Sequence, residues 1–193
     1  SLRQMREQQR KSERKRQKVE NERLRAVYEL TTALNATLSY KRVLETALDL
    51  SVRAMHPDED EDFNDKLVSA VLLFVGNKLV IKSARRFTSA DQRLVFTGAE
   101  GVLGAAIEEG EAVLTQKVGY DPELRRVIAL RNCTSGYCVP LRMGFTVYGV
   151  LLFAHPEPEY FTQERREMLE LIGKQSVIAI QNARLYQDLV EEK

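Results

Sequence analysis

The sequence predicts an α+β fold built on an antiparallel sheet of about six strands, with a long helical extension at the N-terminus. Two hairpin patterns, at residues 67–87 and 137–153, each join two strand-like runs through a tight turn, and helical patterns gather at both ends of the chain. Strands joined in this way pair antiparallel, whereas a parallel sheet needs a crossover, usually a helix, between successive strands. The order of elements therefore favours an antiparallel sheet over a doubly wound one.

The first 25 residues differ from the rest of the chain in charge. They contain ten Lys or Arg and four Glu, a net charge of +6, whereas the whole chain of 193 residues carries +1, so the remainder carries −5. Glu and Lys or Arg recur three or four residues apart, and such pairs support a solvent-exposed helix. We expect residues 1–25 to form a charged linker or signalling helix and residues 26–193 to form one domain.

Apolar periodicity begins after this charged stretch. A one-sided helical stripe is formed by Val27, Leu30, Leu34 and Leu38. A second amphipathic helix is predicted over 43–55, where His56-Pro57 ends it, and the acidic run 58–65 is predicted to be a loop. Near the other end of the chain, Thr162 is suited to cap a long helix that runs from 163 to 193.

Strand signals and two short helices lie between the terminal helices. The two hairpins turn at Gly76-Asn77 and at Gly144-Phe145. Asp121 is suited to the N-cap of a one- to two-turn helix. Pro140 cannot donate a ladder hydrogen bond, so its strand needs an open edge or a bulge there. The expected elements are strands at 67–75, 79–87, 94–96, 112–115, 137–141 and 146–153, a short glycine-bounded helix within 100–111, and a second short helix within 119–130.

Cysteine usage and hydropathy indicate the compartment. Two cysteines in a chain of this length do not make a disulfide framework, and no secretory segment precedes them. No apolar run approaches the ~20 residues of a membrane span. We expect a reduced, cytoplasmic compartment. Because the chain begins with Ser and helical patterns run to both ends, we expect it to be a piece of a longer protein.

Four stretches in this order resemble a GAF domain. They are "TALNATLSYKRVLETALDLS" and "EGVLGAAIEEGEAVLTQ", then "YCVPLRMGFTVYGVLLF" for the family's penultimate hairpin and "FTQERREMLELIGKQSVIAIQNARLYQDL" for its closing helix. The resemblance spans roughly residues 24–190. It implies a central antiparallel sheet with the terminal helices packed on one face and a small-ligand pocket on the other. It also implies a regulatory module joined to an output domain such as a histidine kinase, serine phosphatase or diguanylate cyclase.

The cofactors found in subclasses of this family can be compared with the residues. Cyclic-nucleotide members carry an Asn-Lys-x-Phe-Asp-Glu type motif, which "FNDKL" at 63–67 does not reproduce. Bilin attachment resembles a Cys-His pair or an Asp-x-Cys-Phe motif, and neither Cys133 nor Cys138 is followed by His or Phe. Haem needs an axial ligand, and His56 and His155 both stand at the ends of predicted elements. We expect no bilin, haem or cyclic nucleotide, and the ligand stays unknown.

Catalysis is not expected from these residues. The sequence has no Gly-rich phosphate loop, no Gly-x-Ser-x-Gly elbow and no cysteine–histidine cluster with metal spacing, and its acidic run lacks the glycine and spacing of a calcium loop, so no metal site is expected. Cys133 and Cys138 are either a redox pair or sensor thiols, or, as we prefer for Cys138, small buried apolar residues. Free methionine sulfoxide reductases, the enzymatic relatives in this fold family, need a set of cysteines that this chain lacks.

We place the predicted ligand pocket between the sheet and residues 98–135. Arg85 or Arg86 could neutralise an anionic ligand, or could pair with acidic groups on the surface. In an alternative interpretation the module is purely structural, and its own large side chains fill the pocket, namely Tyr120, Leu124, Ile128 and Tyr137. The candidate lining residues are Phe87, Leu103, Ile107, Thr115, Tyr120, Leu124, Ile128 and Tyr137.

The terminal helices are expected to join two copies of the chain in a parallel homodimer. Small residues beside the apolar stripes permit close helix–helix approach, although Ser12, Arg16 and Arg23 weaken the coiled-coil seam. The basic residues of the arm are interleaved with Glu and lie all around the helix without aromatic residues, so we expect neither nucleic-acid binding nor membrane insertion. The expected interface residues are Val27, Leu30, Leu34, Ala179, Ala183 and Tyr186.

Overall fold

The structure is a computed structural model that describes the backbone of residues 1–55 and 66–191, and the side chains in these ranges except those of 32–39, 54 and 186–191. The predicted acidic loop and His56 lie outside the described residues. The chain divides into two compact units. One comprises Tyr40–Asn182, and the other comprises Ser1–Ser39 with the chain from Ala183 onward.

The N-terminal helix α1 runs without interruption over Leu2–Met55, 54 residues. The separate helix predicted to begin at residue 43 is therefore wrong. The linking residues 39–42 are Ser-Tyr-Lys-Arg, and this stretch contains neither glycine nor proline to stop a helix that has already started. The helix does end at Met55, directly before His56-Pro57, as the position of the proline predicts.

Six strands form one sheet in the order β3-β2-β1-β6-β5-β4, and every pairing between neighbours is antiparallel. This confirms the predicted fold class. Gly76 and Gly144 adopt φ of 64° and 63° in the two hairpin turns, a left-handed conformation that glycine accepts readily. The strands are β1 Val68–Val75, β2 Lys78–Arg85, β3 Val95–Phe96, β4 Val113–Thr115, β5 Ser135–Met143 and β6 Thr146–His155.

Pro140 lies in the part of β5 that pairs with only one neighbouring strand. Strand β4 begins at Val113, which pairs with Cys138, so β5 continues beyond Cys138 with β6 alone. A bulge follows between Leu141 and Arg142. The proline therefore lies at an open edge just before a bulge, in agreement with the prediction.

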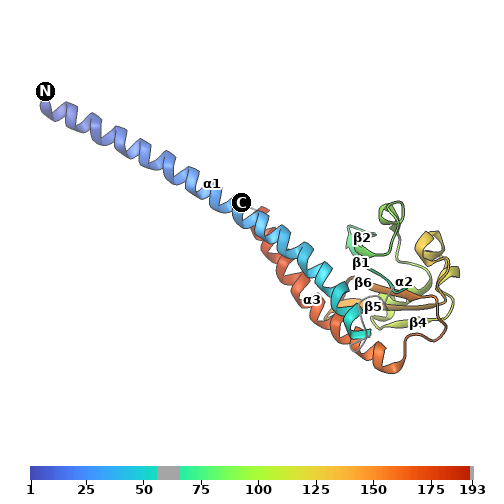
Figure 1. The fold of residues 1–193 in the computed structure, drawn as a ribbon. Helices are drawn as coiled ribbons and strands as arrows, with labels where there is room; N and C mark the ends of the chain where they lie inside the picture. Colours follow the sequence, from blue (N-terminus) through green and yellow to red (C-terminus); the bar gives the residue numbers. More distant parts are fainter. Residues whose placement is uncertain (56–65, 192–193) are drawn as a thin grey trace. The chain divides into compact units, whose positions relative to one another are not determined.

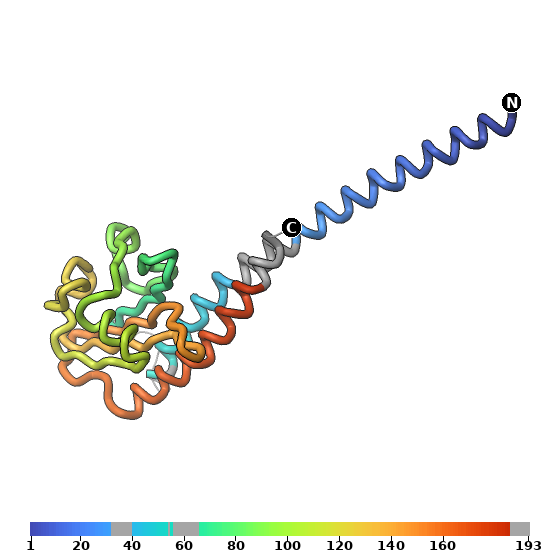
Figure 2. Tube along the Cα trace, turned by 180° about the vertical axis from the view of Figure 1, so that it is seen from behind, coloured from blue at the N-terminus to red at the C-terminus, as the bar shows by residue number. Residues whose placement is uncertain are grey.

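Apolar side chains alternate along the strands and form a separate core on each face of the sheet. On β6, Leu151 and Phe153 face one core, while Val150 and Leu152 face the other. Residues 40–55 of α1 and the first part of α3 (Gln163–Glu191) cover the first core, and Figures 1 and 2 show these two helical stretches side by side. The Thr162 hydroxyl accepts from the Arg165 backbone nitrogen at 3.4 Å, which confirms the predicted cap of α3.

The second core is covered by helix α2 (Gly101–Glu109) and by residues 118–133, which we call the cover segment. A short helix was predicted within 119–130, and this is wrong. The segment instead makes three single 3-10 turns, η3 Val118–Tyr120, η4 Leu124–Arg126 and η5 Ile128–Leu130. Val127, with φ −81° and ψ 116°, is extended and separates the last two turns. The predicted glycine boundary of α2 is confirmed, because the helix ends at Gly110 with φ of 68°.

Candidate ligand site

The face of the sheet beneath α2 and the cover segment carries a continuous apolar cluster, which we call the covered cluster. Leu103 from α2, Leu124 and Leu130 from the cover segment, and Leu79 from the sheet are all fully buried in it. Side chains therefore occupy the interior in this conformation. Its members are Val68, Ala70, Leu72, Leu79, Ile81, Phe96, Val102, Leu103, Ala106, Val118, Leu124, Val127, Leu130, Cys133, Cys138, Val150, Leu152 and Ala154.

Glu123 fastens the middle of the cover segment to the turn that enters α2. Its Oε1 accepts from the backbone nitrogen and the hydroxyl of Thr97, both at 2.7 Å, and from the Gly98 nitrogen at 3.2 Å. Its Oε2 accepts from the Glu100 nitrogen at 3.2 Å. Burial alone raises the pKa of this carboxyl, but the hydrogen bonds from Thr97, Glu100 and Gly98 outweigh it and lower the pKa below its ordinary value.

Asp121 makes a second attachment at the start of α2. Its Oδ1 accepts from the Val102 nitrogen at 2.8 Å, and its Oδ2 accepts from the nitrogens of Glu123 and Leu124 at 3.2 Å. The predicted capping residue thus does receive amides of the turn that follows it, although that turn is not an α-helix. Gly101 has φ of 60°, and a Cβ at this position would overlap the Asp121 carboxylate.

Asp91 makes a third attachment, this time from the body of the domain to the cover segment. It is only 1 % exposed, and its carboxylate accepts from the nitrogens of Ile128 and Ala129 at 2.8 and 3.1 Å. It also accepts from the Thr88 nitrogen at 3.2 Å. Burial raises the pKa of Asp91, but the hydrogen bonds from Ile128, Ala129 and Thr88 outweigh burial and lower the pKa below its ordinary value.

Arg126 adds a contact on the outside of the cover segment. Its guanidinium donates to the Val95 carbonyl at 2.8 Å and lies 5.0 Å from the centre of the Phe96 ring. Most of these attachments are made by side chains rather than by strand or helix ladders. The cover segment is therefore held by a few discrete contacts above an apolar layer.

The structure brings together four of the eight predicted lining residues. Leu103 and Leu124 are buried in the covered cluster, and Phe87 and Ile107 pack partly against it. The other four lie elsewhere. The side chain of Tyr120 is 87 % exposed, that of Ile128 is 45 % exposed, Thr115 is half-buried in β4, and Tyr137 faces the other core.

Tyr137 links β5 to the C-terminal helix. Its ring stacks on Phe161 with centroids 5.9 Å apart, and its hydroxyl donates to Glu170 of α3. Burial, the charge of Glu170 and this hydrogen bond all raise the pKa of the phenol. Alternation in β5 explains the placement, because its neighbour Cys138 faces the covered cluster.

Sequence reasoning missed several residues of the cover segment that are buried. Val127 and Leu130 were not among the candidates, yet both are fully buried with Leu124. These three residues recur at a spacing of three, which is the repeat of a 3-10 helix. This spacing was the available signal.

Arg85 does not point into the covered cluster. Its Nε and Nη2 atoms lie 3.2 Å from Oδ1 of Asp49 on α1. Of the two alternatives for this residue, the structure shows pairing with a carboxylate on the surface.

His155 accepts from the Glu157 nitrogen at 3.0 Å and stacks on Tyr160 with ring centroids 3.6 Å apart.

Both cysteines belong to the covered cluster. Cys133 is 8 % exposed and its thiol lies 3.8 Å from the Ala129 carbonyl, while Cys138 is fully buried. Burial raises the pKa of the Cys133 thiol to about 11 and raises that of Cys138 as well. Thiolates, the reactive form, are therefore scarce at neutral pH. Within the described ranges, no group of three or more His, Cys, Asp or Glu side chains is placed to hold a metal ion.

The residues proposed for helix pairing fall in both units. Val27 and Leu30 are each 62 % exposed, whereas Ala179 and Ala183 are half-buried. The side chains of Leu34 and Tyr186 lie outside the described residues.

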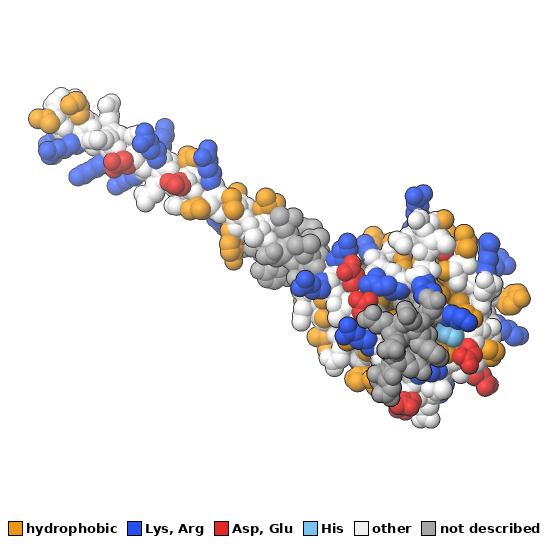
Figure 3. Space-filling model, in the orientation of Figure 1, with side chains coloured by type: hydrophobic (Ala, Val, Ile, Leu, Met, Phe, Trp, Pro, Cys, Tyr) orange, Lys and Arg blue, Asp and Glu red, His pale blue; other side chains and the backbone are white. Residues whose placement is uncertain are grey.

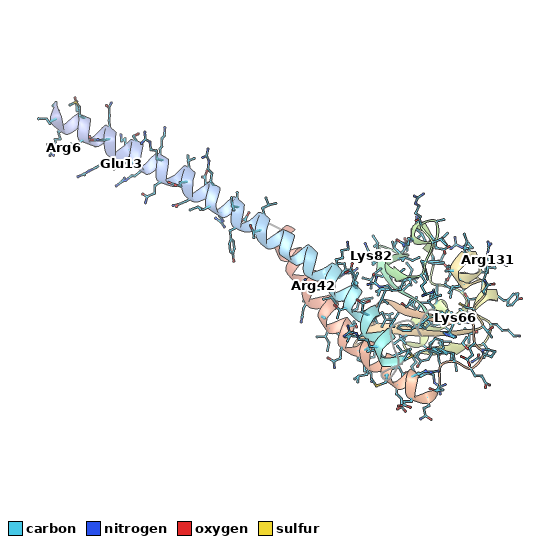
Figure 4. All side chains as sticks on the ribbon, in the orientation of Figure 1. Arg6, Glu13, Arg42, Lys66, Lys82 and Arg131 are labelled. Atoms are coloured by element: carbon cyan, nitrogen blue, oxygen red, sulfur yellow. The ribbon has the colours of Figure 1, made fainter. Side chains whose placement is uncertain are left out.

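Figure 3 shows basic and acidic side chains interleaved along the start of α1, and Figure 4 shows Arg6 and Glu13 projecting from it. No helix in the described part of the chain is long and apolar enough to cross a membrane.

Comparison with known proteins identifies relatives of the chain. It is 27 % identical over 174 residues to an uncharacterised sensor-like histidine kinase of Chloroflexus aurantiacus, an alignment that covers 89 % of this chain and 27 % of the relative. The chain thus spans about a quarter of the length of that protein.

Solved structures share the fold at low sequence identity. A GAF domain/HD domain protein from Geobacter sulfurreducens matches with a TM-score of 0.58 at 13 % identity, covering 76 % of this chain and 96 % of that one. A free methionine-R-sulfoxide reductase from Neisseria meningitidis matches with a TM-score of 0.54 at 19 % identity, covering 78 % and 93 %. The family model for the GAF domain matches residues 32–181. The chain therefore belongs to the GAF domain family.

Proposed function

We propose that this GAF domain is the sensory module of a larger signalling protein and that it binds a small molecule beneath the cover segment. The single observation that carries this proposal is the construction of the covered face. A segment without α-helix or strand is fastened by discrete carboxylate contacts over an extensive apolar cluster. Such a segment can shift as a unit, since its attachments are few and local.

The chemistry of the interior defines the class of ligand. The side chains beneath the cover segment are aliphatic or aromatic apart from the thiols of Cys133 and Cys138. The buried carboxylates of Asp91, Asp121 and Glu123 already accept hydrogen bonds from backbone amides. A compact, largely apolar molecule fits this surface best. Because Leu103, Leu124 and Leu130 fill the interior here, binding requires a conformation in which the cover segment has moved outward.

The similarity to a sensor-like histidine kinase supports a role in relaying this binding event to an output domain. The core on the other face of the sheet consists of α1 and α3 side chains packed on the strands, so a change in the sheet reaches both terminal helices directly. We propose that two copies associate in parallel through these helices. The exposed apolar residues of α1, among them Val27 and Leu30, support this arrangement.

One observation favours a second candidate function, a structural dimerisation module without a ligand. The covered cluster is already filled by its own side chains, as that alternative requires. Leu124 fills it as expected, but Val127 and Leu130 take the place of Tyr120, Ile128 and Tyr137. Thermal unfolding against compact apolar molecules, and against nucleotides, amino acids, oxo-acids and tetrapyrroles, distinguishes the two candidates. A ligand at a hundredfold excess over its Kd stabilises the folded chain by about 2.7 kcal/mol. A screen with no shift favours the structural module.

We also propose that the domain is not itself an enzyme. Its resemblance to methionine-R-sulfoxide reductases is a resemblance of fold, and its two thiols are buried with raised pKa values. An assay of free methionine sulfoxide with a thiol reductant tests this. Turnover that disappears in Cys133→Ser would contradict the proposal.

A further inference from the structure

The loop between β2 and β3, residues 86–94, lies between two contacts that belong to opposite faces of the sheet. Directly before the loop, Arg85 pairs with Asp49 of α1, the helix that covers one face. Within the loop, Asp91 binds the backbone nitrogens of Ile128 and Ala129 in the cover segment on the other face. Arg85, which contacts α1, and Asp91, which contacts the cover segment, are therefore only six positions apart in the sequence.

The loop between these contacts is itself folded. Thr88 and Asp91 bind each other reciprocally, because each backbone nitrogen donates to the other's side chain, at 3.2 and 3.0 Å. A 3-10 turn over Asp91–Arg93 follows, and Phe87 and Leu94 pack partly against the covered cluster. A loop braced in this way transmits a displacement from one end to the other better than an extended one.

The contact with α1 is suited to communication rather than to stability. The side chains of Arg85 and Asp49 are 37 % and 59 % exposed, and exposed ion pairs contribute about 0–1 kcal/mol to folding. Losing this pair should therefore leave the fold intact. Its effect is to fix the end of β2 against α1.

We propose that the β2–β3 loop couples the cover segment to α1, with Asp91 as its contact on one face and the Arg85–Asp49 pair as its contact on the other. Movement of the cover segment displaces Asp91 and the loop, and this alters the pairing of Arg85 with the helix. By linkage, breaking the pair must in turn alter the cover segment. The coupling itself needs no ligand, although its use in signalling rests on the sensory function proposed above.

Hydrogen exchange on the chain of residues 1–193 tests the coupling without a ligand. In Asp49→Asn, we expect the amides of Ile128 and Ala129 to exchange faster by about fivefold, the low end of measured couplings. Amides in the centre of β5 and β6 should be unchanged. Lys41→Gln, an exposed change two turns earlier on the same helix, is the matched control and should exchange like the parent.

A charge swap and a double variant complete the test. Arg85→Asp combined with Asp49→Arg should restore the parent rates at Ile128 and Ala129, because the pair is rebuilt in reverse. In the double variant Asp49→Asn with Asp91→Asn, the amides of Ile128 and Ala129 should exchange no faster than in the more affected single variant. Unchanged rates in Asp49→Asn, or a double effect equal to the product of the two single effects, would overturn the coupling. A coupled loop in a domain that no compound stabilises would count against the sensory function alone.

Discussion

Glu123 receives both the backbone amide and the hydroxyl of Thr97 on a single carboxylate oxygen, each at 2.7 Å. The two residues stand 26 positions apart in the sequence, so this contact joins the cover segment to the turn before α2. Charge-assisted hydrogen bonds of this kind are stronger than neutral ones. The contact makes Glu123 the principal fastening of the cover segment.

Replacing Glu123 with Gln should loosen this fastening. The amide nitrogen of Gln cannot accept from the Glu100 nitrogen, so this part-buried hydrogen bond to a charged group is lost, and such bonds contribute about 1.5–3 kcal/mol. Urea unfolding measures the loss, and Glu109→Gln, an exposed change at the end of α2, should leave the free energy of unfolding unchanged. Equal stability of the two variants would show that Glu123 does not fasten the segment.

Acid should destabilise the domain through Asp91 and Glu123. Both carboxyls have a lowered pKa in the folded chain, so each contributes stability at a pH above its ordinary pKa of about 4. This stability is lost as the pH falls toward the pKa of the folded state. Unfolding midpoints in urea should therefore fall steadily below about pH 4. Asp91→Asn with Glu123→Gln should show a shallower decline, and an identical decline would refute the assignment.

Gly149 should resist substitution because β6 passes very close to β1 at this residue. A Cβ at Gly149 would overlap the Leu72 carbonyl oxygen and would lie 2.8 Å from the Leu73 Cα. Gly149→Val should lower stability by several kcal/mol, more than the ~1–3 kcal/mol typical of overpacking. Gly144→Asn is the control, since that turn has open space and Asn tolerates left-handed φ. If the Gly149→Val variant has the same melting temperature as the parent, the register assigned to β6 is contradicted.

The thiols should be nearly inert in the native chain. With Cys133 at a pKa of about 11 and Cys138 fully buried, a thiol reagent such as DTNB should label neither at neutral pH at the rate of a free cysteine. Both should react at once in denaturant. Rapid native labelling of Cys133 would instead revive the sensor-thiol interpretation.

Helix pairing should depend on one face of α1. Val27→Glu with Leu30→Glu places charge on exposed apolar positions that we assign to the dimer seam. At tens of micromolar we expect light scattering to report a dimer for the parent and a monomer for this variant. Tyr28→Glu makes the same chemical change on a different face of the helix and should remain dimeric. A monomeric parent, or a dimeric double variant, would contradict the arrangement.

The sequence predicted the sheet well because its signals are local. The turns at Gly76 and Gly144 and the alternation in β5 and β6 determine strand pairing directly. The cover segment could not be predicted in the same way. Its conformation depends on Asp91 and Glu123, whose partners lie 37 and 26 residues away, and short-range patterns contain no record of such contacts. For the same reason Tyr120 and Ile128 entered the pocket prediction, although they face solvent.

The central claim is that a small molecule binds beneath the cover segment, and affinity in matched variants tests it most directly. A compound that raises the melting temperature should be titrated by calorimetry into the parent, Glu123→Gln and Glu109→Gln. Because binding requires the cover segment to move outward, loosening it raises the population of the binding-competent state. We therefore predict that Kd falls by about fivefold or more in Glu123→Gln, whereas Glu109→Gln binds like the parent. Identical affinities in all three chains, or no stabilising compound at all, would contradict the account.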